Sequence, residues 1–369
     1  MTEQSNSLSG IRFIVIAAAL VIIIWGIKQA QSVMVSFLVA IFLAMLGTPP
    51  VLWLEKKRIP SAMAVLIVVA FMVTTLVIIG GIVGASINSF SNELPVYQTR
   101  IQEQISAFQS FLKTKGIRSM DKAIVEFINP GAVMSLTAHL FTELGSALSN
   151  IVVILLTVAF ILFEASSFPV KLRAFLGHPQ QVFPQFTKFV GEIERYMVIK
   201  TFISLITGIL IGVWLSIIGV DFPILWGFLA FLLNYVPNVG STIAGVPPVF
   251  LSLIQLGIGA ALMAASGFIA VNFILGNVIE TRLMGRRLGL STLVVFLSLI
   301  CWGSLLGPVG MVLSIPLTLT LRFAFENNKG KQWIAVLLAP EAPAENISTV
   351  SKKVENLIEN SDITKRRSQ

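Results

Sequence analysis

Residues 234–248 read NYVPNVGSTIAGVPP, and this uncharged stretch decides how the C-terminal half of the chain is organised. It holds three prolines and two glycines, residues that normally punctuate regular structure. Its flanks are FPILWGFLAFLL (222–233) and VFLSLIQL (249–256), both strongly apolar. A backbone break is therefore predicted inside sequence that is otherwise apolar enough for a membrane.

The composition around this stretch identifies a polytopic membrane protein. Of 369 residues, 55% are hydrophobic and 12% are charged, whereas soluble domains carry about 25% charged residues. Mean hydropathy is +0.87, and apolar runs of about 20 residues recur, as in membrane-spanning helices. We expect an all-α protein with about six full spans, at residues 11–27, 33–54, 62–87, 147–169, 200–220 and 258–279.

The formal charge of +8 follows from basic loops rather than from nucleic-acid binding. Lysine and arginine gather in residues 56–58, 170–200 and 282–287. Because cytoplasmic loops are enriched in these residues, we place the three segments and both termini in the cytoplasm. The lipid bilayer is the expected partner, and nucleic acid is not.

The spans divide the chain into four parts. Residues 1–87 hold the first three spans, 147–325 a core that contains the two irregular segments 222–256 and 288–321, and 326–369 a polar, partly disordered cytoplasmic tail. Residues 88–146 form an extracytoplasmic insertion with apolar residues at helical spacing. We expect this insertion to form short amphipathic helices that pack on each other or on a neighbouring subunit. A structural cap is favoured over a gating lid.

Two apolar segments, 222–256 and 288–321, are too irregular for simple spans. Residues 222–236, before the first break, would rise about 22 Å as a helix, which is short of the roughly 30 Å hydrocarbon core. We therefore expect two re-entrant helical hairpins, the first from outside and the second from the cytoplasm. The breaks are assigned to Pro237, Gly240 and Pro247 in the first hairpin, and to Gly303, Gly307, Pro308, Gly310 and Pro316 in the second.

The two broken segments resemble each other. VPNVG (236–240) and LGPVG (306–310) each precede a further proline and an apolar limb, and each segment follows one full span. Irregular backbone at membrane depth persists only where it is buried in protein or lines a cavity. Paired broken helices in inverted repeats indicate a transporter's substrate site, although kinks for close helix packing are the alternative.

The first hypothesis is export of a small, neutral, polar solute between the hairpin tips. Asn234, Asn238, Ser241 and Thr242 would bind substrate hydroxyls, helped by backbone freed near Pro237, Gly240, Pro308 and Gly310. Asparagine at a broken helix is also commonly a cap.

Two alternatives remain open. Sodium or lithium exchange for protons needs a titrating carboxylate in the membrane, and the candidates are Glu164, Asp221 and Glu280, all near span ends. Glu280 could instead pair with Arg282 or Arg286 and anchor its loop. The third hypothesis is a non-transporting membrane scaffold that uses the 88–146 insertion and the tail.

The sequence contains no phosphate-binding loop and no catalytic or metal-binding constellation. His139 and His178 lie far apart without metal-ligand spacing. We expect neither an enzyme nor a cofactor or metal.

At the two broken segments the sequence resembles the autoinducer-2 exporter family, the PerM-like membrane proteins. The resemblance covers about residues 10–325 and is strongest over 219–322. It implies a bacterial inner-membrane transporter that forms homo-oligomers, with some members exporting autoinducer-2 and others exchanging sodium or lithium for protons. Matching positions are Asn234, Pro237, Gly240, Pro247, Glu280, Gly285, Gly289, Gly303, Gly307, Gly310 and Pro316.

The sequence departs from the family pattern at two places. Glu164-Ala165 stands where family members often have Asp-Gly, and Ile199-Lys200 stands where Gly-Gln is common. These departures bring the roles of the two positions into question, but they do not affect the family resemblance.

Overall fold

The computed structural model describes residues 15, 18–19, 21–114, 137, 142, 151–165, 179–237, 239–284, 290–326 and 338. Within these residues the chain is helical and contains no strand, as predicted. The first helices are α2 (Gln31–Lys56), α3 (Ser61–Thr114), α6 (Ile151–Ala165) and α8 (Pro179–Ile218). They are followed by α9 (Pro223–Leu233), α10 (Gly240–Leu256), α11 (Ile258–Asn272), the π-helix η1 (Phe273–Glu280), α12 (Thr281–Met284), α13 (Thr292–Val312) and α14 (Ser314–Glu326).

Five helical segments are long and apolar enough to cross a membrane: Gln31–Lys56, Ser61–Glu93, Phe186–Ile218, Ile258–Leu283 and Thr292–Val312. The polytopic prediction is therefore confirmed, while the division into six spans and two hairpins stays a prediction. Helix α13 is long enough to span, although it was expected to be half of a hairpin. Part of the expected span 11–27 lies outside the described residues.

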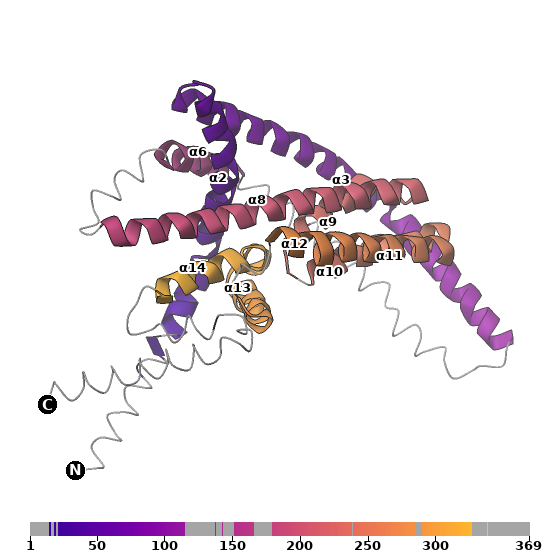
Figure 1. The fold of residues 1–369 in the computed structure, drawn as a ribbon. Helices are drawn as coiled ribbons and strands as arrows, with labels where there is room; N and C mark the ends of the chain where they lie inside the picture. The colour runs from indigo at the N-terminus through magenta and orange to yellow at the C-terminus, as the bar shows by residue number, and fades with distance from the viewer. Residues whose placement is uncertain are drawn as a thin grey trace, which may run out of the picture.

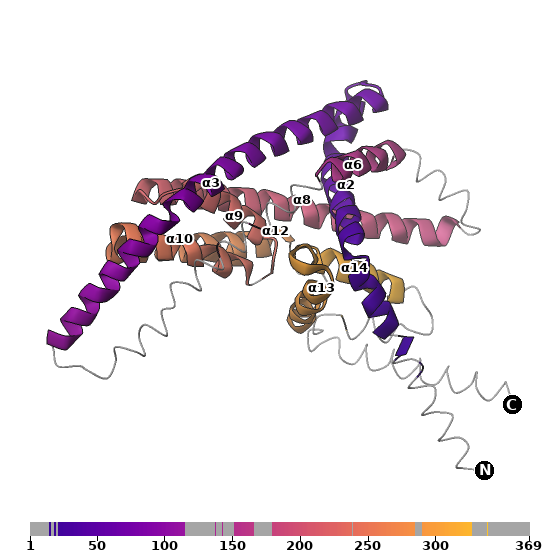
Figure 2. The same ribbon diagram turned by 180° about the vertical axis from the view of Figure 1, so that it is seen from behind.

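Helix α3 extends well beyond the span expected there. It runs without interruption to Thr114 and stands out as the long diagonal helix in Figures 1 and 2. The prediction of separate short helices from residue 88 is wrong over 88–114, because the helical pattern continues in register from the span. Residues 115–146, except Thr137 and Thr142, lie outside the described part.

Helix α8 is the central element. It begins at Pro179 and runs for 40 residues, so the latter half of the basic segment expected as a loop at 170–200 is helical. Figure 1 shows α8 crossing the molecule with α9–α12 alongside it. A Cβ added to Gly208 would lie 2.6 Å from the Gly227 carbonyl oxygen, and one added to Gly227 would lie 2.7 Å from the Gly208 oxygen. Small residues thus let the backbones of α8 and α9 touch.

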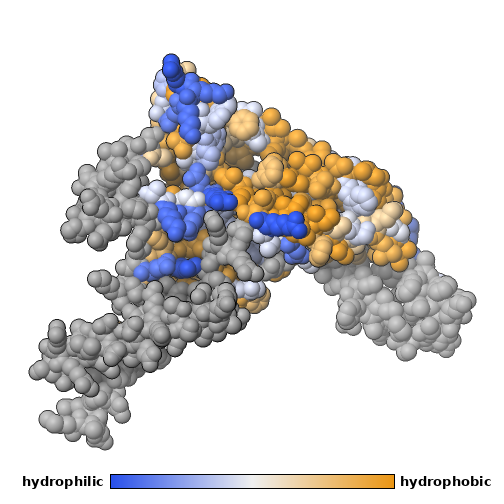
Figure 3. Space-filling view, viewed as in Figure 1, coloured by the Kyte–Doolittle hydropathy of each residue, from blue (hydrophilic) through white to orange (hydrophobic). Residues whose placement is uncertain are grey.

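The outer surface is apolar over much of the view in Figure 3. Large hydrophobic side chains such as Phe71, Phe160 and Ile269 are exposed. In water such a surface would be unfavourable, whereas lipid chains solvate it well. The interior is also mainly apolar, and a small set of polar side chains, including Lys200, Ser204 and Asn234, is buried within it.

The two breaks lie within the two segments where they were expected, but some of the prolines and glycines assigned to them lie inside helices. The first is the linker 234–239 between α9 and α10, and Pro247 lies inside the continuous helix α10. In the second, Gly307 carries φ 69° and ψ −153° and kinks α13. Gly303 is helical and packs on Met311. Pro316 lies in the first turn of α14, where a missing N–H has no helical partner to lose.

Candidate functional site

A line of polar side chains runs along the buried face of α8. Lys200, Ser204 and Thr207 are all at most 5% exposed and follow i, i+4, i+7 spacing, which places them on one helix face. Tyr196, one turn before Lys200, is also buried. Buried polar groups in a membrane protein are unfavourable unless they are paired, and they commonly mark a pathway or a site. We call these four residues the α8 polar face.

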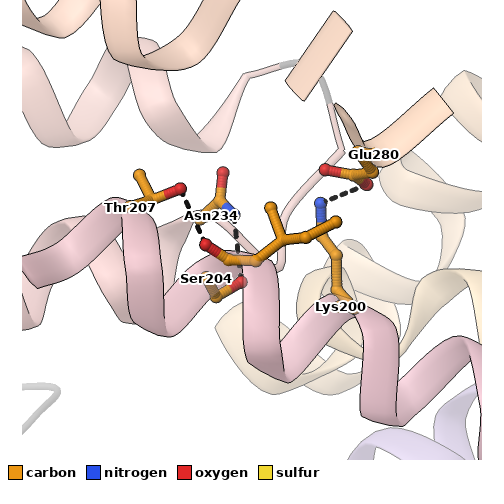
Figure 4. A network of polar contacts seen from close by, with 6 residues as sticks. Lys200, Ser204, Thr207, Asn234 and Glu280 are labelled. Atoms are coloured by element: carbon orange, nitrogen blue, oxygen red, sulfur yellow. Dashed lines mark hydrogen bonds and ion pairs between the residues drawn. The ribbon is translucent and has the colours of Figure 1, made fainter. Parts of the chain in front are cut away.

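The first break supplies the partner of this face. Asn234 closes α9, and its Nδ2 donates to Ser204 Oγ at 3.0 Å. The next residue, Tyr235, donates its hydroxyl to Thr201 Oγ1 at 2.8 Å. Figure 4 shows Asn234 lying over Ser204, with its amide oxygen directed away from that hydroxyl. The Asn234 side chain therefore contacts α8 and does not cap a helix end.

An ion pair lies one turn along α8 from this contact. Lys200 Nζ donates to Glu280 Oε1 at 2.6 Å, and the two side chains are 7% and 19% exposed. Glu280 is the last residue of η1, so the pair joins that π-helix to α8 (Figure 4). The expected partners were Arg282 or Arg286. The structure pairs Glu280 with Lys200, and Arg286 lies outside the described residues. Buried charge favours the partner that is itself desolvated, and Arg282 is exposed.

The other predicted solute-binding residues contribute less to this cluster. Asn238 lies outside the described residues. Thr242 and Pro308 are exposed, while Pro237 and Ser241 are half-buried.

Gly240 and Gly310 are buried for a steric reason that the two breaks share. A Cβ on Gly240 would collide with the Leu233 carbonyl oxygen, and one on Gly310 would collide with that of Trp302. Each glycine also lies against the residue four positions earlier, Val236 or Leu306. The similarity between the two PxVG-like stretches thus extends to their packing.

Asp221 belongs to a separate polar cluster, the α3–α9 joint, formed by Glu93, Tyr97, Asp221 and Gln255. Tyr97 Oη lies 2.6 Å from Glu93 Oε2 and 2.9 Å from Asp221 Oδ2. Gln255 Nε2 donates to Tyr97 Oη and to Asp221 Oδ2. Tyr97 lies beyond Glu93, where the apolar part of α3 ends. Burial and hydrogen bonds to Glu93 and Asp221 raise the pKa of the Tyr97 phenol, so it stays protonated and donates.

Glu164 is exposed near the end of α6, far along the chain from both clusters, and it has an interaction partner. The carboxylates of Glu280 and Asp221, both proposed for ion exchange, therefore lie in different clusters. Glu280 joins the α8 polar face, and Asp221 joins the α3–α9 joint.

Sequence reasoning missed the α8 half of the site: Lys200, Thr201, Ser204 and Thr207. The signal was present as KxxxSxxT (200–207) at the start of an apolar run. Its helical spacing gathers the polar groups on one face. Assigning Lys200 to a loop concealed that pattern, because it was counted with solvated charges.

Apolar helices that surround a buried polar face define a polytopic membrane transporter. The comparisons agree, because the sequence profile of the AI-2E family transporters matches residues 13–329. The chain belongs to the AI-2E transporter family.

Two relatives from Escherichia coli K12 match along nearly their whole lengths. The AI-2 transport protein TqsA is 39% identical over 92% of this chain and 98% of its own. The putative transport protein YhhT is 35% identical over 92% and 97%. A putative transport protein of Haemophilus influenzae is 32% identical over 91% and 98%. The chain is thus a transport protein, not an enzyme, and the family implies a bacterial inner membrane.

Proposed function

We propose that this transporter exports a small, uncharged, polar solute, with autoinducer-2 as the first candidate. The observation that carries the proposal is the buried Asn234–Ser204 contact, which joins the first break to the α8 polar face. Hydroxyl and amide groups bind neutral polar solutes through hydrogen bonds. The relative TqsA, named for AI-2 transport, supports the choice of candidate.

The site would open between α8 and the α9–α10 linker. Ser204 and Asn234 satisfy each other in the closed arrangement and would exchange that bond for bonds to the solute. Asn238, Ser241 and Thr242 remain predicted contributors from the linker side. The neighbouring Lys200–Glu280 pair has no net charge, which suits a neutral solute.

The same pair argues against sodium–proton exchange at Glu280. Its carboxylate already has an ammonium at 2.6 Å, so a second cation would meet a neutralised group. Asp221 lies in the α3–α9 joint with an amide and a phenol as partners. Neutral-solute transport therefore accounts better for the arrangement.

The proposed topology keeps α9–α10 as a re-entrant hairpin. As helices of 11 and 17 residues they rise about 16 and 25 Å, both short of the roughly 30 Å core. The two helices contact each other, and α9 also packs against α8. Cytoplasmic termini, a second hairpin at 288–321, an extracytoplasmic 88–146 segment and a homo-oligomer complete the proposal.

Purified protein in liposomes tests the function, with autoinducer-2 and sodium offered in separate assays. Asn234→Leu should abolish autoinducer-2 flux, and Ser204→Ala should reduce it by about tenfold, the equivalent of one good hydrogen bond. Ser298→Ala is the matched control, because Ser298 is a buried serine that bonds only within its own helix, to Val295 O. Its flux should be unchanged.

Two results would contradict the proposal. One is full autoinducer-2 flux in a correctly inserted Asn234→Leu protein, which would reject the site. The other is sodium-driven proton movement by the intact protein without autoinducer-2 flux, which would favour ion exchange.

A further inference from the structure

The Lys200–Glu280 ion pair is largely buried, its two side chains being 7% and 19% exposed. It lies between two segments that have the length and apolarity of membrane spans, Phe186–Ile218 and Ile258–Leu283. Ionic groups in such segments are unfavourable, and they are commonly retained for a role in the transport process. Removing one partner leaves an uncompensated buried charge, so the pair resists separation unless both groups become solvated together.

The helix that carries Glu280 is unusual. Residues 258–284 run as α11, then the π-helix η1, then α12, and Glu280 is the last residue of η1. Stretches of π-helix are rare and occur frequently at functional sites. A return of η1 to α-helical hydrogen bonding would change the direction in which Glu280 points. A change of hydrogen bonding in η1 would therefore alter the Lys200–Glu280 contact.

The Lys200–Glu280 ion pair lies at one end of the α8 polar face. Lys200 precedes Ser204 by one turn of α8, and Ser204 accepts the hydrogen bond of Asn234. The ion pair holds the end of η1 against α8 at Lys200, beside the rest of the polar face (Figure 4). We propose that the Lys200–Glu280 pair is a positioning latch that closes this side of the polar face and that opens, with η1, during transport. The proposal rests on the transporter role alone and not on the identity of the solute.

The test uses thiol labelling, which needs no solute. Cys301 is the single cysteine, so Cys301→Ser gives a thiol-free background, and Ser204→Cys places a small reporter at a fully buried position of the polar face. A membrane-impermeant maleimide is applied to full-length protein in liposomes. Lys200→Met, Glu280→Gln and the double variant should each raise the labelling rate by about tenfold or more, because the closed state loses its charge pairing.

A charge-swapped protein, Lys200→Glu with Glu280→Lys, distinguishes the effect of charge pairing from the effect of side-chain shape. It should return labelling toward the unmodified rate. Ser298→Cys, buried on α13, is the matched reporter and should stay slow in every variant. Thermal unfolding identifies any variant that has lost its fold, and the charge-swapped protein then provides the decisive comparison.

Three results would overturn the latch. Unchanged labelling of the Ser204 reporter in the double variant would show that the pair does not close the face. Fast labelling in the charge-swapped protein would show that charge pairing is not the cause. Faster labelling of the Ser298 reporter would show general loosening rather than local opening.

Discussion

At the scale of single residues, Lys200 is the most informative side chain. A lysine normally keeps its ammonium in water, and here that group is buried against Glu280. The charge is therefore tolerated because a specific partner on another helix accepts it.

The first prediction concerns this pair. Lys200→Met alone should destabilise the protein by about 3–5 kcal/mol, because Glu280 is left buried without a counter-charge. Lys200→Met with Glu280→Gln should recover most of that loss, since neither charge remains. Thermal unfolding in one detergent measures both midpoints. Equal destabilisation by the single and double variants would contradict the coupling.

At the scale of elements, α8 and α9 depend on close backbone approach. Gly208 and Gly227 face each other with no room for a side chain on either. This contact holds α9 in place, and thereby holds Asn234 over Ser204. Glycine in a helix is intrinsically unfavourable, so these two are retained for packing.

The second prediction follows from that contact. Gly208→Ala should destabilise the protein by about 1–3 kcal/mol, because the added methyl meets backbone that cannot move aside cheaply. Gly84→Ala in α3 is the control, since nothing lies within 4 Å of its added Cβ. The control should be neutral or stabilising by up to about 1 kcal/mol through helix propensity. The thermal unfolding midpoints of the Gly208→Ala and Gly84→Ala proteins are compared with that of the unmodified protein. A similar shift in both variants would contradict the prediction.

At the scale of the whole molecule, α3 is attached to the remainder near its polar end by the α3–α9 joint. Tyr97 shares its hydroxyl between Glu93 on its own helix and Asp221 at the start of the α9–α10 unit. Burial keeps that phenol protonated, as the direction of its pKa shift indicates. These hydrogen bonds attach the extended end of α3 to the α9–α10 unit, which carries part of the candidate site.

The third prediction tests this attachment. Tyr97→Phe removes the shared hydroxyl and leaves the Glu93 and Asp221 carboxylates without their common donor, so residues 94–114 should exchange amide hydrogens faster. Thr99→Val is the control, because the Thr99 hydroxyl bonds only to Pro95 O of its own helix. Hydrogen exchange measured by mass spectrometry compares the two. Equal protection in Tyr97→Phe and the unmodified protein would show that the joint does not restrain α3.

Some features were determined by the sequence alone. Long apolar runs without charge indicate membrane helices, and the proline and glycine clusters near 234–248 and 303–316 indicate a break in each segment, because both signals depend on local chemistry. Asn234 was found for that reason. The exact position of each break could not be predicted from the sequence. Pro247 is accommodated within α10, whereas Gly307 has a positive φ and kinks α13.

Other features were decided only by tertiary structure. Glu280 pairs with Lys200, which is 80 residues away, and not with the nearby Arg282. This pairing depends on how η1 packs against α8. The same packing turns Ser204 toward Asn234 and buries both. Burial makes the free-energy cost of leaving a charge or a hydroxyl unpaired much larger than it is in water. Sequence therefore supplied the polar residues and the broken helices, while long-range helix packing determined which of them form the site.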